Sequence, residues 1–241
     1  GRVTFTFDDG PDTWTPVLLS ELKRLHLRAV FFVFGWKAKA YPGVIRQELA
    51  DGDLVENHTW DHPSLTGAST GTPVLQPAKV KAELIAATQA IEADGAPAPS
   101  LWRPPFGDVT IADAQLAADL DLRLVEPFSV SSGGLPVDSR DWTGISAAQI
   151  ARDVTLGYWT KVNGRMFHVA GIRNGSIIGF HDSGPADCVQ ESRTSYCGYA
   201  INAIKALPAI VAYMNAHHLG VTINVPADAT GGVVPSTSPA H

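Results

Sequence analysis

The sequence has little cysteine, no excess of basic charge and no long apolar segment. Among its 241 residues, 24 acidic side chains outnumber 18 lysines and arginines, which gives a formal net charge of -6. This balance gives no electrostatic reason to expect a nucleic acid or an anionic membrane as a partner. No apolar run approaches the roughly 18 residues that a membrane helix needs. We therefore expect a globular protein with one large domain or two small ones.

The cysteines are only two, Cys188 and Cys197, and they enclose a short polar segment. Such a pair favours a disulfide over a metal site, with two free thiols as the alternative. A disulfide would place the protein in an oxidising compartment, so we expect it to be secreted or at the cell surface. No signal peptide precedes the first strand-like segment, and a cleaved one is compatible with this expectation.

Strand-like and helical patterns alternate along the chain. The strand-like segments are residues 3–7, 28–34, 53–57, 101–106, 122–130, 176–181 and 221–225, and the helical ones are 15–26, 42–52, 77–95, 110–122, 146–154 and 199–218. This alternation predicts βαβ units and a parallel sheet. Either a closed barrel or an open doubly wound sheet would place the chemistry at the carboxyl ends of the strands. Residues 227–241 lack periodicity and are predicted to be a linker or disordered tail.

Two adjacent carboxylates, Asp8 and Asp9, end the first strand and are followed at once by Gly10 and Pro11. Adjacent side chains on an extended segment point to opposite faces, so an ordinary strand would bury one of these charges. Burying an unpaired charge is costly. A turn built on Asp-Gly-Pro is the structural alternative, but the rest of the sequence offers partners for both carboxylates.

Two histidines follow the third strand. His58 and His62 lie four residues apart, and Pro63 disfavours a helical conformation at His62, so we expect a strand end and a turn. An isolated pair of histidines is more often structural. Here the pair follows a strand, as Asp9 does, and two imidazoles with one carboxylate suit zinc, cobalt, nickel or iron.

Three further strand ends carry polar or aromatic side chains. Arg103 cannot lose its charge and would hold a buried carboxylate such as Asp8 ionised, although a surface arginine is the alternative. Asp141 and Trp142 follow another segment, and His181 ends the most apolar strand, where it has few local reasons to occur other than function. Five polar clusters, each at a strand end, are therefore expected to converge.

The segments TFDDGP, HTWDH, RPPFG, DSRDW and the strand of His181, in this order, resemble the motifs of the polysaccharide deacetylases, the NodB-type domain of carbohydrate esterase family four. The resemblance covers roughly residues 2 to 226. It implies an α/β fold, a distorted and incomplete (β/α) barrel, with one catalytic domain over residues 1–226. It also implies a metal-dependent hydrolase that removes acetyl groups from chitin oligomers, peptidoglycan or acetylated xylan, by amide hydrolysis with ester hydrolysis as the alternative.

The resemblance assigns a role to each carboxylate of the first strand. Asp8 is similar to the catalytic base, and Asp9, His58 and His62 are similar to the ligands of a divalent metal, with zinc expected before cobalt, nickel or iron. Two adjacent carboxylates then do two jobs. A metal would stabilise one, and Arg103 the other.

The remaining motifs receive roles in the same way. His181 would protonate the leaving group, held in its charged form by Asp141. The backbone N–H of Phe106 would stabilise the oxyanion, and Pro105 beside it would contact substrate. Trp142 would form a wall of the acetyl pocket, and a position in the core is its alternative.

Two features depart from the family pattern. Gly179 stands where a leucine is usual, which leaves the acyl specificity open, and the segment 158–174 is longer than expected. Tyr158, Trp159 and Phe167 in that segment could stack on sugars, although buried packing is the simpler interpretation. A catalytically silent carbohydrate-binding protein and a hydrolase of non-glycan acyl amides are the competing hypotheses. Nothing suggests an obligate partner, and we expect a monomer.

Overall fold

The structure is a computed structural model, and it describes residues 1–126, 136–162, 164–183 and 199–226. The predicted Cys188–Cys197 pair and the predicted tail over 227–241 lie outside the described residues. Within the described ranges, no helix combines the length and apolar character needed to cross a membrane.

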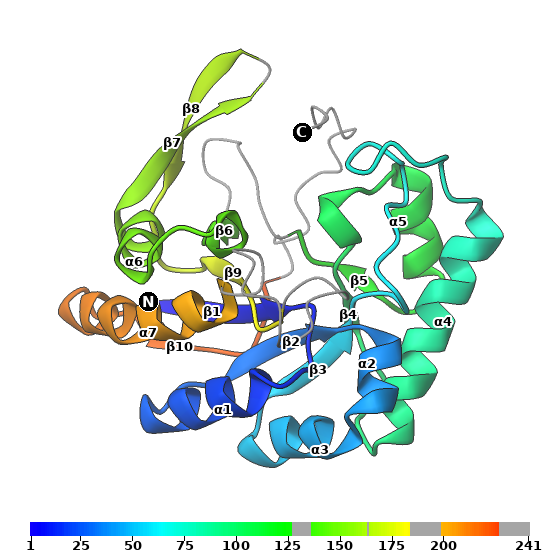
Figure 1. Ribbon diagram of the computed structural model, residues 1–241, viewed down its shortest axis with the longest axis horizontal. Helices are drawn as coiled ribbons and strands as arrows, with labels where there is room; N and C mark the ends of the chain where they lie inside the picture. The colour runs from blue at the N-terminus through cyan, green and yellow to red at the C-terminus, as the bar shows by residue number, and fades with distance from the viewer. Residues whose placement is uncertain (127–135, 163, 184–198, 227–241) are drawn as a thin grey trace.

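A curled, mostly parallel sheet forms the centre of the molecule (Figure 1). Its strands follow the order β5-β4-β3-β2-β1-β9-β6, and β10 pairs with β1 beside this path. The sheet is an incomplete barrel, as the resemblance implies. Its strands are β1 (Arg2–Asp8), β2 (Ala29–Val33), β3 (Leu54–Asn57), β4 (Leu101–Trp102), β5 (Arg123–Leu124), β6 (Pro136–Asp138), β9 (Ile177–His181) and β10 (Gly220–Val221).

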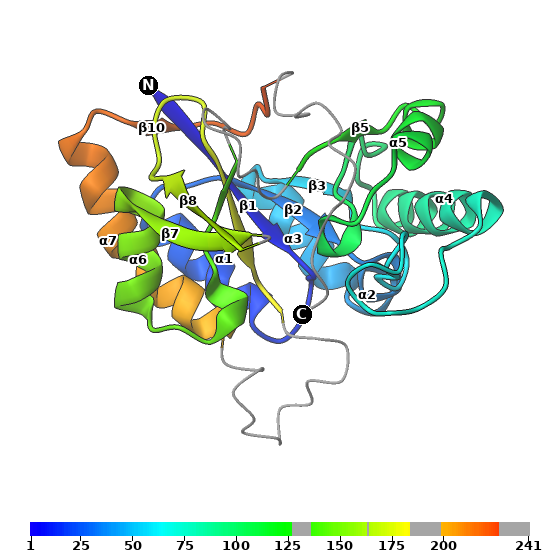
Figure 2. The same ribbon diagram turned by 90° about the horizontal axis from the view of Figure 1, so that it is seen from above.

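Helices cover the outside of the curled sheet. Figure 2 shows α6 and α7 at one end of the molecule and α4 and α5 at the other. The helices are α1 (Thr15–Arg24), α2 (Gly35–Ala40), α3 (Pro42–Asp51), α4 (Pro77–Ala93), α5 (Ile111–Ala118), α6 (Ala147–Leu156) and α7 (Tyr199–Ala216), with 3₁₀ turns η1 (Pro105–Gly107) and η2 (Asp141–Thr143). α5 begins with a capping box between Thr110 and Asp113, which satisfies free N–H groups at its first turn.

The central strands are buried on both faces, which explains why they read as continuous apolar runs. On β1, the ring of Phe7 stacks on Phe31 of β2 at 5.5 Å and on Phe180 of β9 at 5.4 Å between ring centroids. All three side chains are essentially inaccessible to solvent. This packing fixes the positions of the residues that follow each strand.

Several predicted strands are shorter than expected. The segment 101–106 is a strand only over Leu101–Trp102, because Pro104 and Pro105 have no N–H to donate to a sheet. The predicted strand over 221–225 is reduced to Gly220–Val221.

The long segment after α6 forms an antiparallel hairpin of β7 (Gly157–Val162) and β8 (Arg165–Ala170), which projects from the end of the sheet that carries α6 (Figure 1). Its two faces differ. Tyr158 is buried under the Arg140 guanidinium, whose carbon lies 4.7 Å from the ring centroid, and Phe167 is half-buried. Trp159, on the opposite face, is 64% exposed. The interpretation of buried packing is therefore wrong for Trp159.

Candidate metal and acid–base site

The register of the sheet places the candidate residues at one edge. β1 pairs in parallel with β2 and β9 so that Asp8 lies opposite both Phe32 and His181. Asp9 follows at the end of β1, and His58 follows the last residue of β3. These side chains meet because the carboxyl ends of parallel strands lie at the same edge.

Asp9, His58 and His62 form a compact cluster whose candidate ligand atoms all lie within 4.8 Å of one another. The Asp9 Oδ1 atom is 3.4 Å from His58 Nε2 and 3.7 Å from His62 Nε2. This Oδ1 is buried and has no hydrogen-bond partner within the described ranges. His58 Nδ1 lies 2.7 Å from the backbone oxygen of Arg103, to which it would donate, so Nε2 keeps the free electron pair that a metal ion would take. The donor set fits a divalent cation.

The electrostatics of the cluster also favour binding of a divalent cation. Burial alone would raise the pKa of Asp9, but the neighbouring histidines outweigh it and hold this pKa well below its usual range. Burial lowers the pKa of His62 to about 3, against the opposing charge of Asp9. The carboxylate is therefore ionised and the His62 imidazole neutral, which are the forms that bind metal ions.

The second carboxylate, Asp8, is held by Arg103. The Nη1 atom of Arg103 donates to Asp8 Oδ1 at 2.6 Å and to Thr6 Oγ1 at 2.8 Å, and its Nε donates to the Val125 carbonyl at 3.3 Å. The guanidinium is fully buried and lies over the Phe32 ring at 4.3 Å. Asp8 thus has a permanent positive partner, and the alternative of a surface arginine at position 103 is wrong.

His181 has a carboxylate partner of its own. Asp141 Oδ1 lies 2.8 Å from His181 Nδ1, and Asp141 Oδ2 accepts the His181 backbone N–H at 2.8 Å. Burial lowers the pKa of His181, but the charge and hydrogen bond of Asp141, with smaller contributions from Asp9 and Asp8, raise it to about 10. His181 is therefore protonated at neutral pH.

Two exposed aromatic residues lie near these groups. The Phe106 ring is 4.4 Å from the His62 ring, and the Phe106 backbone has a left-handed φ of 58° next to the buried Pro105. Trp142 is exposed, and its Nε1 donates to Asp138 Oδ2 at 3.3 Å. The alternative that Trp142 is a core residue is therefore wrong.

Sequence reasoning missed two residues that hydrogen-bond to the backbone of Asp9. Lys37 and Ser183 both donate to the backbone carbonyl of Asp9 at 2.8 Å. A single lysine in a helical pattern gives no local signal of such a contact. Ser183 could have been suspected only from its place two residues after His181.

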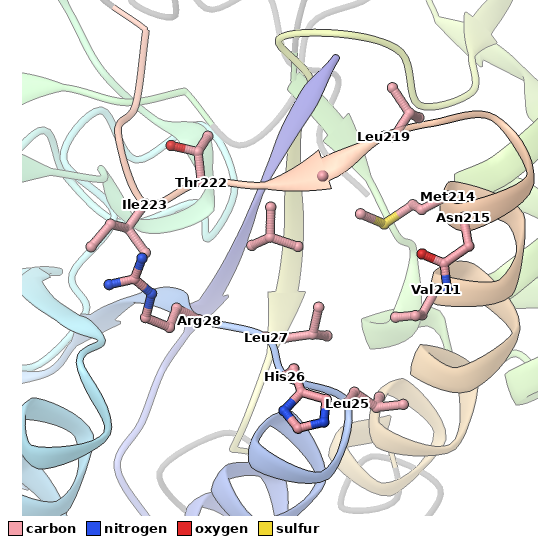
Figure 3. A pocket seen from close by; sticks show the side chains of 12 residues that line it. Leu25, His26, Leu27, Arg28, Val211, Met214, Asn215, Leu219, Thr222 and Ile223 are labelled. Carbon is pink, nitrogen blue, oxygen red and sulfur yellow. The ribbon is translucent and has the colours of Figure 1, made fainter.

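One cavity lies far from this edge. It has a volume of about 450 Å³ and lies at the amino ends of β1 and β2, between the α1–β2 turn, α7 and β10 (Figure 3). None of the candidate site residues lines it. Its walls are Leu25, His26, Leu27, Arg28, Val211, Met214, Asn215, Leu219, Gly220, Val221, Thr222 and Ile223.

Comparison with known proteins identifies the family. The model of the polysaccharide deacetylase family matches residues 1–125, which is half of the chain. The chain belongs to the polysaccharide deacetylase family. The resemblance inferred from the motifs is thereby confirmed.

Named members of the polysaccharide deacetylase family show the range of related proteins. The chain is 31% identical over 182 residues to a peptidoglycan-N-acetylglucosamine deacetylase of Listeria monocytogenes, a match that covers 75% of the chain and 32% of that protein. It is 32% identical over 185 residues to a chitooligosaccharide deacetylase of a Bradyrhizobium species, covering 76% and 71%. The chain spans only about a third of the length of the Listeria protein.

A solved structure of a carbohydrate esterase confirms the fold. A family 4 carbohydrate esterase from Streptomyces lividans, determined in complex with acetate, superimposes with a TM-score of 0.69 at 28% sequence identity. The match covers 100% of this chain and 97% of that one. The predicted incomplete barrel in a single domain is therefore correct.

Proposed function

We propose that this deacetylase is a metal-dependent hydrolase that removes acetyl groups from an N-acetylglucosamine polymer, either chitin oligomers or peptidoglycan. The strongest support for this proposal is the arrangement of ionisable side chains at one edge of the sheet. The cluster of Asp9, His58 and His62 lies beside both the Asp8–Arg103 ion pair and the His181–Asp141 pair. A carboxylate base and a protonated acid beside a cation site are what acyl hydrolysis needs.

Asp9, His58 and His62 would hold the divalent cation, and we propose zinc, with cobalt, nickel or iron as substitutes. When bound, such a cation polarises the acetyl carbonyl and lowers the pKa of water. The protein contributes the remaining groups. Its unpartnered, buried Asp9 Oδ1 supports this assignment, since a buried carboxylate oxygen without a hydrogen bond is costly unless a cation compensates it.

In the proposed mechanism, Asp8 receives the proton of the attacking water. The Arg103 guanidinium, 2.6 Å away, keeps Asp8 ionised before that transfer. As the acetyl carbon becomes tetrahedral, the backbone N–H of Phe106 donates to the developing oxyanion. Pro105 would fix that N–H and contact the substrate, and the position of the Phe106 ring against His62 supports a place next to the reacting acetyl group.

His181 then gives its proton to the leaving nitrogen. An amine leaves poorly without that proton, so the acid has to be charged at the pH of the reaction. Asp141 holds the ring through Nδ1, which leaves Nε2 as the donating atom. Trp142, exposed one residue further on, would form a wall of the acetyl pocket.

The proposed enzyme comprises one catalytic domain over residues 1–226 and acts as a secreted or cell-surface monomer. This location follows from its proposed polymeric substrates. The mechanism applies equally to esters, so O-deacetylation of acetylated xylan is a second candidate activity. Gly179, which lies in register between Thr6 of β1 and Asp138 of β6, motivates acyl groups other than acetyl on non-glycan amides as a third.

Acetate release tests the proposal directly. Purified protein is assayed on N-acetylglucosamine oligomers and on acetylxylan, before and after chelation and after zinc or cobalt is restored. We expect activity that disappears with the chelator and returns with the metal. Asp8→Asn should lower kcat by about 10²–10⁴-fold, the usual contribution of a general base. Asp119→Asn, at the exposed C-cap position that follows α5, is the matched control.

Each other outcome selects an alternative. Acetate release from acetylxylan alone favours the ester substrate. Activity on a panel of non-glycan acyl amides, without acetate from either glycan, favours the third candidate. Glycan binding that survives Asp8→Asn, with no activity in the parent protein, favours a catalytically silent carbohydrate-binding protein.

A further inference from the structure

Lys37 lies on α2 and contacts Asp9 of the candidate metal cluster, and only 3% of it is exposed. Its Nζ donates to the backbone carbonyl of Asp9 at 2.8 Å and also to the Ser183 hydroxyl. That hydroxyl in turn donates to the same Asp9 carbonyl at 2.8 Å. Two donors from different elements, α2 and the residues after β9, therefore fix one peptide group.

The Lys37 ammonium also contacts the aromatic ring that supports the two histidines. Its Nζ lies 5.0 Å from the centroid of the Phe34 ring, within the range of a cation–π contact. The same ring packs against His58, with 5.6 Å between centroids, and against His62, with 4.9 Å. The buried Lys37 ammonium thus contacts both the Asp9 backbone and the Phe34 ring that packs against His58 and His62.

A cation is a costly choice for this position. Burial lowers the pKa of Lys37, and the charges of Asp12, Asp9 and Asp182 oppose that effect. A positive charge also repels a second cation nearby, and Lys37 lowers the pKa of His62 in this way. If charge were all that mattered, Lys37 would weaken metal binding.

The backbone of Asp9 offers a reason for the opposite effect. Asp9 has a φ of 76°, in the left-handed region that residues other than glycine adopt at a cost of about 1–3 kcal/mol. This conformation directs the side chain that follows β1 toward the two histidines. Hydrogen bonds that hold the Asp9 carbonyl would stabilise that conformation before any ligand arrives.

We infer that Lys37 is a positioning residue for the metal site, which holds the Asp9 peptide and the Phe34 ring so that the three ligand atoms are preorganised for a divalent cation. The inference rests on the proposed function, because that proposal makes Asp9, His58 and His62 the ligands. Ser183 is the second donor in the same arrangement.

Metal affinity, measured without substrate, tests this role. The dissociation constants of Zn²⁺ and Co²⁺ are determined by calorimetric titration of the metal-free protein, and the Co²⁺ absorption spectrum reports ligand geometry. We expect Lys37→Met to raise both dissociation constants by about 10–100-fold, as loss of a supporting partner typically does. Lys37→Arg, which keeps the charge and the donors, should recover part of the affinity. Lys39→Met changes an exposed lysine of the same helix and should leave the affinity unchanged.

Two results would overturn the inference. Binding by Lys37→Met that equals or exceeds that of the parent protein would show that charge repulsion outweighs positioning. If Lys37→Met does not fold, Ser183→Ala replaces it, and an unchanged dissociation constant there would equally refute the role. A parent protein that binds neither metal would overturn the proposed function as well, whereas equal binding by parent and variant would overturn this inference alone.

Discussion

Buried ionisable groups at the carboxyl edge of the sheet and around α3 have pKa values shifted in opposite senses. The shifts favour the charged form at the edge and the neutral form around α3. At the edge, neighbouring groups lower the pKa of Asp9 and raise that of His181, so both are ionised. Burial raises the pKa of Glu48, on α3, well above its usual range, and it raises the pKa of Asp53, just after α3, to about 6. Both oxygens of Glu48 are buried without a hydrogen-bond partner in the described part of the chain.

The difference shows that burial alone does not decide the state of a group. Burial always favours the neutral form. Asp9 is ionised because histidines contact its carboxylate, and His181 because Asp141 faces its ring, whereas Glu48 has no such partner among the described residues. At the carboxyl edge, neighbouring side chains therefore keep buried groups ionised although burial favours the neutral form, as expected for a catalytic site.

Removing the partner of the acid should have the largest effect. Asp141→Asn deprives His181 of the charge that raises its pKa, so burial should then favour the neutral ring at neutral pH. We expect kcat to fall by about 10²–10⁴-fold. The alkaline limb of the pH–rate profile should move to lower pH by more than one unit. Thr143→Ala, an exposed position on η2, is the control, and an unmoved alkaline limb would contradict the assignment.

Removing the partner of the base should cost stability. Arg103→Met leaves the Asp8 carboxylate buried without its cation, and breaking such a buried pair typically costs about 3–5 kcal/mol. Urea unfolding at pH 7 measures the loss. Arg46→Met, which breaks the 3.6 Å pair between the exposed Arg46 and the partly buried Asp94, is the control and should cost less than about 1 kcal/mol.

A double variant tests whether this loss comes from the orphaned charge. Adding Asp8→Asn to Arg103→Met removes the unpaired carboxylate, so part of the lost unfolding free energy should return. Strictly additive losses would show that Arg103 acts through packing on Phe32 instead.

Removing the buried Glu48 carboxyl group of α3 should raise stability. Glu48→Leu replaces a buried carboxyl group that has no hydrogen-bond partner in the described structure. We expect the free energy of unfolding at pH 7 to rise by about 1–3 kcal/mol, because the cost of burying the polar group disappears. Glu48→Gln keeps a polar group of similar shape and should gain less. A loss of stability in Glu48→Leu would show that the carboxyl group has an unrecognised partner.

Asp53 should produce the smallest effect, visible in the pH dependence. Its pKa rises from 3.8 to about 6, mainly through burial. The folded state thus binds this proton more tightly, and the resulting stabilisation is present below the usual pKa and lost as the pH rises through about 6. Asp53→Asn keeps an acceptor for the Ala29 N–H and removes the titration. Unfolding free energies between pH 4 and 7 should therefore fall less steeply than in the parent, and identical slopes would refute the assignment.

Much of the fold follows from pattern. Continuous apolar strands alternating with helices predicted the parallel sheet, and the motif order predicted the family and the incomplete barrel, both of which are confirmed. The β7–β8 hairpin was missed as an element. Its signal is present in the sequence as Asn163-Gly164 between two alternating segments, a pattern typical of tight hairpins. The shortened β4 reflects Pro104 and Pro105, whose effect on sheet pairing outweighed the apolar run.

The candidate site was predictable to a different depth. Residues at strand ends, such as Asp8 and His181, could be named because parallel topology brings strand ends together. Their catalytic roles remain predictions. Lys37 could not be found, since its contact with Asp9 depends on the tertiary position of α2 and not on any local spacing.

The hairpin has a consequence for how this protein can diversify. Gly157 and Ala170 lie opposite each other at its base, and Ile172 N donates to Val154 O just beneath, so the chain leaves and rejoins the domain at almost the same point. An excursion with adjacent ends can be lengthened, trimmed or exchanged without redirecting the strands on either side. The exposed surface of the hairpin can therefore vary among related sequences while the spacing between Asp8 and His181 stays the same.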